Sequence, residues 1–363
     1  MPATWKHERV VGVVGSAGSG RSSLITALAQ AGAHASAPDA SGSHDPLAVI
    51  DWRGTHVALL DDLQVEQALL VPDALLVVVS SPDGVDTALG ALWQRCEELR
   101  IPRIVVITKL DHEHADMDET VAVLRRVLSD GPELLRLTMP VLDDDATLGG
   151  FIDLATTEIW NWTGPDVTRH ACDPEHLALI GETRDELIAD LAMLSEDPRL
   201  AASLQVGMHP GIAQITEALA ATSRTAHAQL IVGSGRGARG PVGAELILDL
   251  LVSALPSPAE RHVPVVMRPD GAAMLPVQTG PDSALVATVA ADDPGHGALV
   301  RVFAGALGDA VSVDGVLPAV GITVTMATAQ LAWARSASPL AVGSSLSAPD
   351  NPLVIAVPDA EPA

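Results

Sequence analysis

The sequence predicts an α/β domain with a parallel sheet covered by helices, followed by a small β-barrel domain. Apolar runs without alternation at 74–79 and 104–107 are typical of strands buried on both faces of a parallel sheet. Helical segments alternate with such strands along the first part of the chain. After residue 258, short strands punctuated by Gly and Pro predict the barrel. The 363 residues suffice for two or three domains.

The elements of the first domain are expected in a regular order. Strands are predicted at 10–14, 57–60, 74–79, 104–108 and 229–233, and helices at 22–31, 88–98, 117–128 and 241–254. Residues 174–195 are predicted to form an acidic amphipathic helix and a loop, which resemble an insertion. Prolines at 256 and 258 end the last helix, because proline has no backbone N–H to donate. We therefore predict a first domain over residues 1–260, with an insertion at about 155–228, and a barrel domain over 261–363.

A hairpin is expected at the start of the barrel. Strands are predicted at 285–289 and 299–302, and the segment DPGHG at 293–297 between them is rich in turn-forming residues. Further short strands are expected from there to the end of the chain.

Composition and charge exclude several classes of protein. The 21 Lys and Arg against 46 Asp and Glu give a formal net charge of −25, so no overall positive field attracts DNA or an anionic membrane. No apolar run approaches the ~20 residues that span a bilayer, and the opening residues lack the apolar stretch of a signal peptide. Cys96 and Cys172 are too far apart in sequence for a CxxC metal pair. We therefore expect a cytoplasmic protein that binds neither membranes nor DNA.

A glycine-rich loop between an apolar strand and a helix is the strongest local signal. It matches the phosphate-loop pattern GxxxxGK[ST] except that arginine replaces lysine. The residues expected to surround phosphate are Gly15, Ser16, Ala17, Gly18, Ser19, Gly20, Arg21, Ser22 and Ser23. Glycines let successive backbone N–H groups turn toward phosphate oxygens, and the helix adds its positive N-terminal end. The Ser22 hydroxyl is expected to bind Mg²⁺. Arg21 keeps the positive charge of lysine but carries it on a planar guanidinium fork instead of a compact ammonium. The alternative interpretation is that the segment is only a tight connection between the strand and the helix and binds no ligand.

Two further segments predict recognition of guanine. Thr108, Lys109 and Asp111 form a TKxD pattern directly after a buried apolar strand. The aspartate can accept two hydrogen bonds from guanine N1 and N2, whereas adenine would leave it unpaired. The lysine stem is expected to lie over the base. Backbone N–H groups after a later strand are expected to contact the guanine carbonyl, or else to form only a flexible turn; these belong to Gly233, Ser234 and Gly235.

The chain resembles the N-terminal half of bacterial elongation factor G, including the elongation factor G-like proteins of actinobacteria. Besides the nucleotide motifs, the resemblance is carried by VVSSPDGV at 78–85, IPRIVVITKLD at 101–111, GGFIDL at 149–154, LPSP at 255–258 and GSSLSAPDNP at 343–352. It implies a P-loop GTPase domain with an inserted subdomain, then a barrel like domain II of that family. It also implies GTP or GDP as ligand, Mg²⁺ as its companion ion and the ribosome as a partner. The family's third to fifth domains, which drive translocation, are expected to be missing.

The chain departs from the family's pattern where the γ-phosphate would be sensed. In the family a DTPGH motif follows the second core strand, and here only Asp61 matches, as an expected Mg²⁺ ligand. Gln64 replaces the glycine that senses the γ-phosphate, and Val65 replaces the histidine that positions the attacking water. Residues 33–51, where the first switch should lie, hold no convincing threonine, and Thr55 is too close to the next strand. The catalytic residues are unknown, and the pattern favours a degenerate GTPase.

Three hypotheses for the function stay open. The first is a translation-associated protein that binds GTP and GDP and hydrolyses GTP weakly or not at all. The second is an active GTPase that takes its missing groups from the ribosome. The third is a scaffold without nucleotide, or a decayed paralogue, which Arg21 and the short switch region favour.

Other conspicuous side chains are interpreted as structural. His112, His114 and Asp116 are close enough in sequence to bind a metal, but the resemblance places them in a solvated loop. Cys96 is expected to fill a buried position on a helix. The tryptophans at 160 and 162 are expected to pack the insertion onto the core rather than to stack on bases, because their neighbourhood carries no basic groups.

Overall fold

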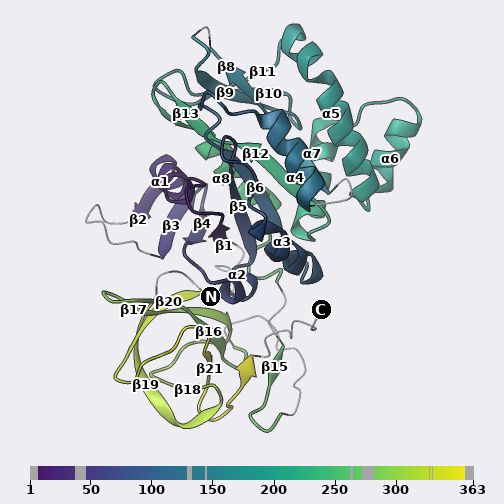
Figure 1. Ribbon diagram of the computed structural model, residues 1–363. Coiled ribbons are helices and arrows are strands. Elements are labelled where there is room, and N and C mark those ends of the chain that lie inside the picture. Colours follow the sequence, from purple (N-terminus) through teal and green to yellow (C-terminus); the bar gives the residue numbers. More distant parts are fainter. Residues whose placement is uncertain are drawn as a thin grey trace. The chain divides into compact units, whose positions relative to one another are not determined.

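Figure 1 shows the chain as a computed structural model, which describes residues 7–36, 46–128, 133–143, 145–261, 265–271, 282–326, 328 and 330–355. The chain forms two compact units. Unit 1 comprises Met1–Gly12, His34–Asp73 and Pro256–Ala363, and unit 2 comprises Val13–Ala33 and Ala74–Leu255. These units group the residues differently from the predicted domains 1–260 and 261–363, which remain a prediction together with the insertion at about 155–228.

Unit 2 is built on parallel strands that are buried on both faces. The strands are β5 (Ala74–Ser80), β6 (Arg103–Thr108), β12 (Gln229–Gly233) and β7 (Leu134–Arg136), and Figure 1 shows the first three side by side. Each pairs in parallel with the next. Their Val, Leu and Ile side chains are almost wholly buried, as expected for strands covered by helices. The predicted α/β fold is therefore confirmed.

Four helices of unit 2 lie where the sequence predicts them, apart from small changes at their ends. They are α1 (Arg21–Ala31), α3 (Ala88–Glu98), α4 (Met117–Leu128) and α8 (Ala244–Ala254), and they pack as the pairs α1 with α8 and α3 with α4. Helix α4 has acidic residues in its first turn and basic residues in its last, which complements the helix dipole. Cys96 on α3 is fully buried, as predicted, and burial raises the pKa of its thiol to about 11.

The predicted start of the last helix, at residue 241, is wrong. Residues Gly240–Val242 instead form strand β14, which pairs with β13 (Gly235–Gly237) in a small hairpin. Helix α8 begins only after Gly243, whose φ of 102° is a left-handed conformation that few other residues adopt readily. The glycines on either side of Pro241 therefore favour a hairpin over a longer helix.

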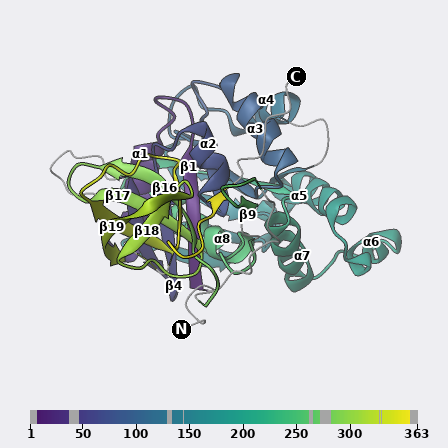
Figure 2. The same cartoon turned by 90° about the horizontal axis from the view of Figure 1, so that it is seen from below.

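Unit 2 also contains a four-stranded antiparallel sheet that the sequence did not predict, and two of its strands precede residue 155, where the predicted insertion begins. Its strands are β8 (Thr138–Leu142), β9 (Leu148–Asp153), β10 (Glu158–Asn161) and β11 (Thr168–Ala171). Three helices follow: α5 (Pro174–Leu194), α6 (Pro198–Gln205) and α7 (Ile212–Arg224). Figure 2 shows α6 farther from β9 than α5 and α7. No helix of the described residues combines the length and apolar character needed to cross a bilayer.

Two tryptophans attach the insertion to the rest of unit 2. The rings of Trp160 and Trp162 stack with centroids 6.0 Å apart, and both side chains are buried. Trp162 Nε1 donates a 2.7 Å hydrogen bond to Glu245 on α8. The expected packing role is therefore confirmed. The expectation that no basic group lies near is wrong, because Trp160 pairs across the strands with Arg169, whose guanidinium lies 4.5 Å from the ring centroid.

Unit 1 contains strand residues of the first half of the chain. Strand β1 (Glu8–Val14) has its first residues here and pairs in parallel with β4 (Thr55–Leu60), which forms a hairpin with β3 (Leu47–Trp52). Strand β2 (Ala33–Ser36) precedes β3 in the chain, and the short helix α2 (Val65–Leu70) follows β4. Thr55 lies in β4 itself, buried, so it belongs to the strand, as its position in the sequence indicates.

The second half of unit 1 is a closed six-stranded barrel, as predicted. Its strands, in order around the barrel, are β16 (Val286–Asp293), β17 (Gly297–Ala304), β20 (Leu331–Ser336), β19 (Val316–Met326), β18 (Ala310–Val313) and β21 (Ser345–Ser347). Strands β15 (Val266–Met267) and β22 (Val354–Ile355) pair beside it. The turn predicted between the first two barrel strands is present, and Asp293 accepts hydrogen bonds from the N–H groups of Gly295 and His296.

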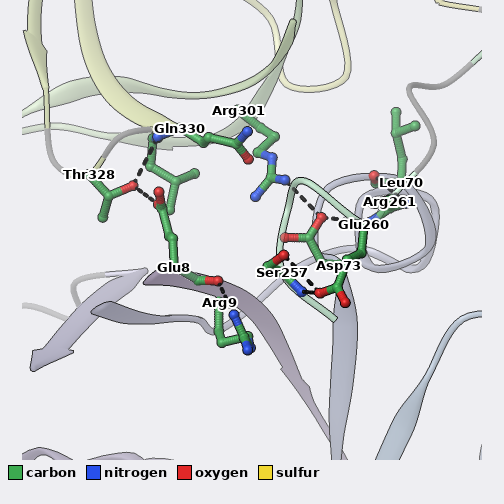
Figure 3. Close-up of polar contacts among 11 residues, drawn as sticks. Glu8, Arg9, Leu70, Asp73, Ser257, Glu260, Arg261, Arg301, Thr328 and Gln330 are labelled. Atoms are coloured by element: carbon green, nitrogen blue, oxygen red, sulfur yellow. Dashed lines mark hydrogen bonds and ion pairs between the residues drawn. The ribbon is translucent and has the colours of Figure 1, made fainter. Parts of the chain in front are cut away.

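One buried apolar cluster joins the barrel to the other strands of unit 1. It contains Val10 of β1 and Ala58 of β4 together with Leu299 and Leu331 of the barrel. Beside it, Glu8 is only 1% exposed and accepts a hydrogen bond from the Thr328 hydroxyl (Figure 3). Burial raises the pKa of the Glu8 carboxyl, whereas that hydrogen bond and the charge of Arg301 oppose the increase.

We expect the substitution Glu8→Gln to stabilise the protein at neutral pH. Because the folded-state pKa of Glu8 is raised, folding takes up a proton, and this residue's contribution to stability falls as pH rises from the unfolded pKa through the folded one. Glutamine can still accept from Thr328 and carries no charge to desolvate. Thermal unfolding of both proteins from pH 4 to 8 measures the effect. A difference in melting temperature that does not change with pH would contradict this account.

Candidate nucleotide-binding site

The predicted phosphate loop connects β1 to α1 in a tight, ordered turn. Gly18 and Gly20 have φ values of 80° and 93°, and the Ser19 N–H donates to the Ser16 carbonyl over 3.1 Å. A Cβ atom added to Gly15 would lie 2.4 Å from the carbonyl oxygen of Val78, so the loop passes directly against β5. The loop therefore has glycine at the two positions where its backbone is left-handed, and α1 begins directly after it at Arg21. Phosphate binding by this loop remains a prediction. Ala17, Ser22 and Ser23 are exposed along it.

Thr108 connects this loop to the end of β6. Its hydroxyl lies 2.6 Å from the carbonyl oxygen of Ser19 and 3.2 Å from that of Val79, and it can donate to either. The side chain is buried. Gly20 packs on the same threonine, since an added Cβ would meet its Oγ1 at 3.4 Å. The phosphate loop and the TKxD segment are therefore held together by a buried contact that the sequence patterns do not reveal.

The two segments predicted to recognise guanine also lie together. Asp111 Oδ1 accepts a 2.8 Å hydrogen bond from the Arg236 N–H, and the Ser234 N–H donates to the carbonyl of Ile107 over 2.8 Å. Gly235 packs closely here, because a Cβ there would lie 2.9 Å from Asp111 Oδ1 and 2.6 Å from a methyl group of Leu148. Gly233 packs as closely on Phe151. The exposed Asp111 carboxylate is therefore held beside the 233–235 loop with capacity to accept further hydrogen bonds.

Lys109 has a partner that sequence reasoning missed. Its ammonium donates to Asp83 Oδ2 over 2.6 Å, and the Ser80 hydroxyl donates to the same oxygen over 2.6 Å. The hydrogen bond from Lys109, and then that from Ser80, hold the pKa of the Asp83 carboxyl below its ordinary value. Both members of the ion pair are substantially exposed, so the pair contributes little to stability. Its effect is to orient the lysine, whose φ of 58° already constrains the backbone.

The two predicted Mg²⁺ ligands are located in different units, Ser22 in unit 2 and Asp61 in unit 1. Asp61 follows β4, is 3% exposed, and accepts a hydrogen bond from the Asp62 N–H through one carboxylate oxygen. A hydroxyl and a carboxylate are oxygen donors of the kind that Mg²⁺ binds. The residues therefore suit the ion chemically, and their joint use remains a prediction. Within the described ranges, no three His, Cys, Asp or Glu side chains gather closely enough to hold a metal by themselves.

The residues predicted to stand in place of the γ-phosphate sensors lie at the start of α2. Gln64 precedes the first turn of the helix, and Val65 is its first residue with 54% of its surface exposed. An isopropyl group has no atom that can accept or donate a hydrogen bond, so Val65 cannot orient a water molecule.

The fold and the site together define a P-loop GTPase domain joined to a translation-factor-type barrel. Residues 33–257 match the family model described as "Elongation factor Tu GTP binding domain". The chain therefore belongs to the family of elongation factor Tu-type GTP-binding domains. The phosphate loop precedes the matched residues, so the assignment of that loop rests on its own sequence and geometry.

Similar proteins confirm the resemblance to elongation factor G. The chain is 29% identical to an elongation factor G-like protein of Mycobacterium tuberculosis, over 67% of this chain and 33% of that protein. It is 30% identical to elongation factor G 2 of Geobacter metallireducens, over 71% and 38%. It is 28% identical to a mitochondrial ribosome-releasing factor 2 of Drosophila sechellia, over 58% and 32%. The chain therefore matches about a third of the length of these relatives.

A solved structure supports the fold. The crystal structure of the protein ttk003000868 from Thermus thermophilus superposes with a TM-score of 0.72 at 23% identity, and the match covers 94% of this chain and 54% of that one. At this identity the likeness establishes the fold alone.

We expect Thr108→Val to weaken the phosphate loop. The substitution removes the buried hydrogen bond to the Ser19 carbonyl at nearly constant volume, so the free energy of unfolding should fall by about 1–2 kcal/mol. Thr26→Val is the matched control, because the Thr26 hydroxyl donates to the Ser22 carbonyl at an exposed position and its loss should cost less than about 0.5 kcal/mol. Urea titration measures both variants. Equal losses would contradict a special role for Thr108.

Proposed function

We propose that this chain binds GDP and GTP and acts in translation in the cytoplasm, with weak or absent hydrolysis of GTP. The observation that carries the proposal is the junction in unit 2 where Thr108 contacts the phosphate loop while Asp111 lies against the 233–236 segment. One purine nucleotide could therefore reach both segments. The names of the family and of the related factors support guanine nucleotide as ligand and translation as the process.

The chemistry of the base-binding residues favours guanine. Asp111 can accept from guanine N1–H and N2–H, and the backbone N–H groups of the 233–235 loop can donate to O6. Adenine presents an acceptor at N1 and a donor at C6, so each of these contacts would be lost. Asp83 would hold the Lys109 stem extended beside the base.

The phosphates would be bound by the N–H groups of residues 15–20 and by the positive end of α1. Arg21 would supply the cationic charge in place of lysine, as a planar fork rather than a point charge. If Mg²⁺ binds, Ser22 and Asp61 would be its protein ligands, and the ion would neutralise charge between the phosphates.

Weak hydrolysis follows from the two replaced residues. Val65 offers no group to orient water, and Gln64 puts a side chain where the family carries glycine. An active GTPase that receives these groups from the ribosome is the second candidate, and a scaffold that binds no nucleotide is the third. Titration of the protein with fluorescent GDP and GTP, with and without Mg²⁺ and with ATP as competitor, separates the third from the others. Absence of saturable binding at hundreds of micromolar would reject the proposal.

We expect Asp111→Asn to exchange guanine specificity for xanthine specificity. Xanthine has a carbonyl in place of the 2-amino group, and an asparagine amide can donate to it. Loss of two hydrogen bonds to a charged acceptor predicts a decrease of about 100-fold in GDP affinity, with a gain in affinity for XDP. Asp166→Asn, which makes the same change at another exposed residue, is the control. Competition against fluorescent GDP measures both variants, and an unchanged GDP affinity in the Asp111 variant would place the base elsewhere.

We expect the double substitution Gln64→Gly and Val65→His to raise GTP turnover by about 100-fold if only these groups are missing, because a positioned general acid or base contributes on that order. Phosphate release with and without ribosomes measures the rate. The single substitution Gln64→Gly is the control, since it leaves the water without a partner. If the double variant binds GTP and its turnover is unchanged, further groups are missing.

A further inference from the structure

The segment of residues 63–73, which we call the α2 segment, is packed into the barrel side of unit 1. It contains α2 and the residues that lead toward β5. The resemblance in sequence predicts that it lies where the family carries its γ-phosphate-sensing switch. Such a switch must be able to change conformation between the diphosphate and triphosphate complexes. The contacts between the α2 segment and the barrel therefore decide how easily the segment can change conformation.

Apolar side chains anchor the C-terminal half of the α2 segment. Val71 is fully buried in the cluster that contains Leu299 and Leu331 of the barrel. Leu70 packs against a second barrel cluster that includes Phe303. Leu63, at the other end of the segment, also contacts the first cluster. Any displacement of α2 would expose these apolar surfaces or would have to carry the barrel strands along.

Two arginines from the C-terminal half of the chain hold the same segment by polar contacts. Arg301 Nη2 on β17 donates to Asp73 Oδ1 over 2.8 Å, and both side chains are about 1% exposed. Arg261 Nη2 donates to the carbonyl oxygen of Leu70, the last residue of α2, over 3.0 Å, and Arg261 Nη1 lies 3.7 Å from Asp73 Oδ1. Figure 3 shows Arg301 pointing from the barrel toward Asp73.

A backbone hydrogen bond fixes Asp73, the last residue of the α2 segment. The Asp73 N–H donates to the carbonyl of Val10 on β1 over 2.7 Å, so the aspartate backbone cannot follow a moving helix. Separating Asp73 from Arg301 is disfavoured, because it breaks a buried ion pair and leaves only the more distant Arg261 guanidinium beside the carboxylate. Opening the α2 segment would therefore break this ion pair, the bond to the Leu70 carbonyl and the contacts with two apolar clusters together.

We propose that Arg301 and Arg261 lock the α2 segment to the barrel, so that it keeps one conformation whichever guanine nucleotide is bound. Only the second part of this proposal rests on the proposed function, namely that the α2 segment keeps the same conformation with either guanine nucleotide. The contacts that hold α2 are made by residues of the chain alone, and variants of these residues can be tested without a ligand.

The test is amide hydrogen exchange of the purified full chain, read in peptides that cover residues 63–73. In Arg301→Met we expect exchange of these amides to be about tenfold faster or more than in the unsubstituted protein, because the open state becomes more populated. Peptides from β18 and β19 report global unfolding and should change less. Arg335→Met is the matched control: Arg335 lies on the same barrel, where it donates to the His296 carbonyl, and its loss should leave the α2 segment unchanged.

A folded Arg301→Met protein with unchanged exchange over 63–73 would overturn the lock. If that variant does not fold, Arg261→Met decides in the same way, since it removes the bond to Leu70 while leaving the buried Asp73–Arg301 pair in place. The second arm compares protein saturated with GDP and with a non-hydrolysable GTP analogue. Equal exchange over 63–73 supports the lock, and faster or slower exchange with the analogue overturns it. If neither nucleotide binds, the proposed function is rejected. Hydrogen exchange over residues 63–73 in the Arg301 and Arg261 variants then still tests whether these arginines hold the α2 segment.

Discussion

Parallel strands end at the same edge of a sheet, and the candidate nucleotide site depends on this constraint. In unit 2 the loops that follow β5, β6 and β12 all leave from the carboxyl ends of parallel neighbours. Each of these loops contributes a residue: Asp83, Lys109 and Ser234. Lys109 donates to Asp83, and the N–H of the next residue, Leu110, donates to the Ser234 carbonyl. The sheet thus gathers residues that are separated by more than a hundred positions in the sequence.

The sequence predicts best what is decided locally. The bounds of α3, α4 and β12 agree with their patterns because apolar periodicity and flanking charges determine them. The antiparallel sheet of β8 to β11 was missed because its strands are short and glycine occurs within β9, so the period-two signal is weak. The Lys109 partner, Asp83, was missed for another reason: only tertiary structure brings the two side chains together.

Some of the few basic residues are buried inside the fold rather than exposed at the surface. Several arginines are used inside the fold: Arg103 lies 4.1 Å from the centroid of the Trp93 ring and donates to the Trp93 carbonyl, and Arg301 pairs with Asp73. Both guanidinium groups are about 1% exposed, so neither can contact a ligand at the surface. The formal net charge of −25 repels anions overall, which makes local recognition by backbone N–H groups more important for an anionic ligand.

The buried Asp73–Arg301 pair also limits how this protein can evolve. Replacing both residues by apolar ones of similar volume can be nearly neutral, whereas losing either one alone leaves a charge stranded in the interior. Every path away from the pair therefore crosses an unfit single mutant, and random drift will rarely remove it. Surface residues such as Gln64 and Val65 meet no such barrier. A substitution at such exposed positions costs little stability, whereas the buried ion pair constrains both of its residues together.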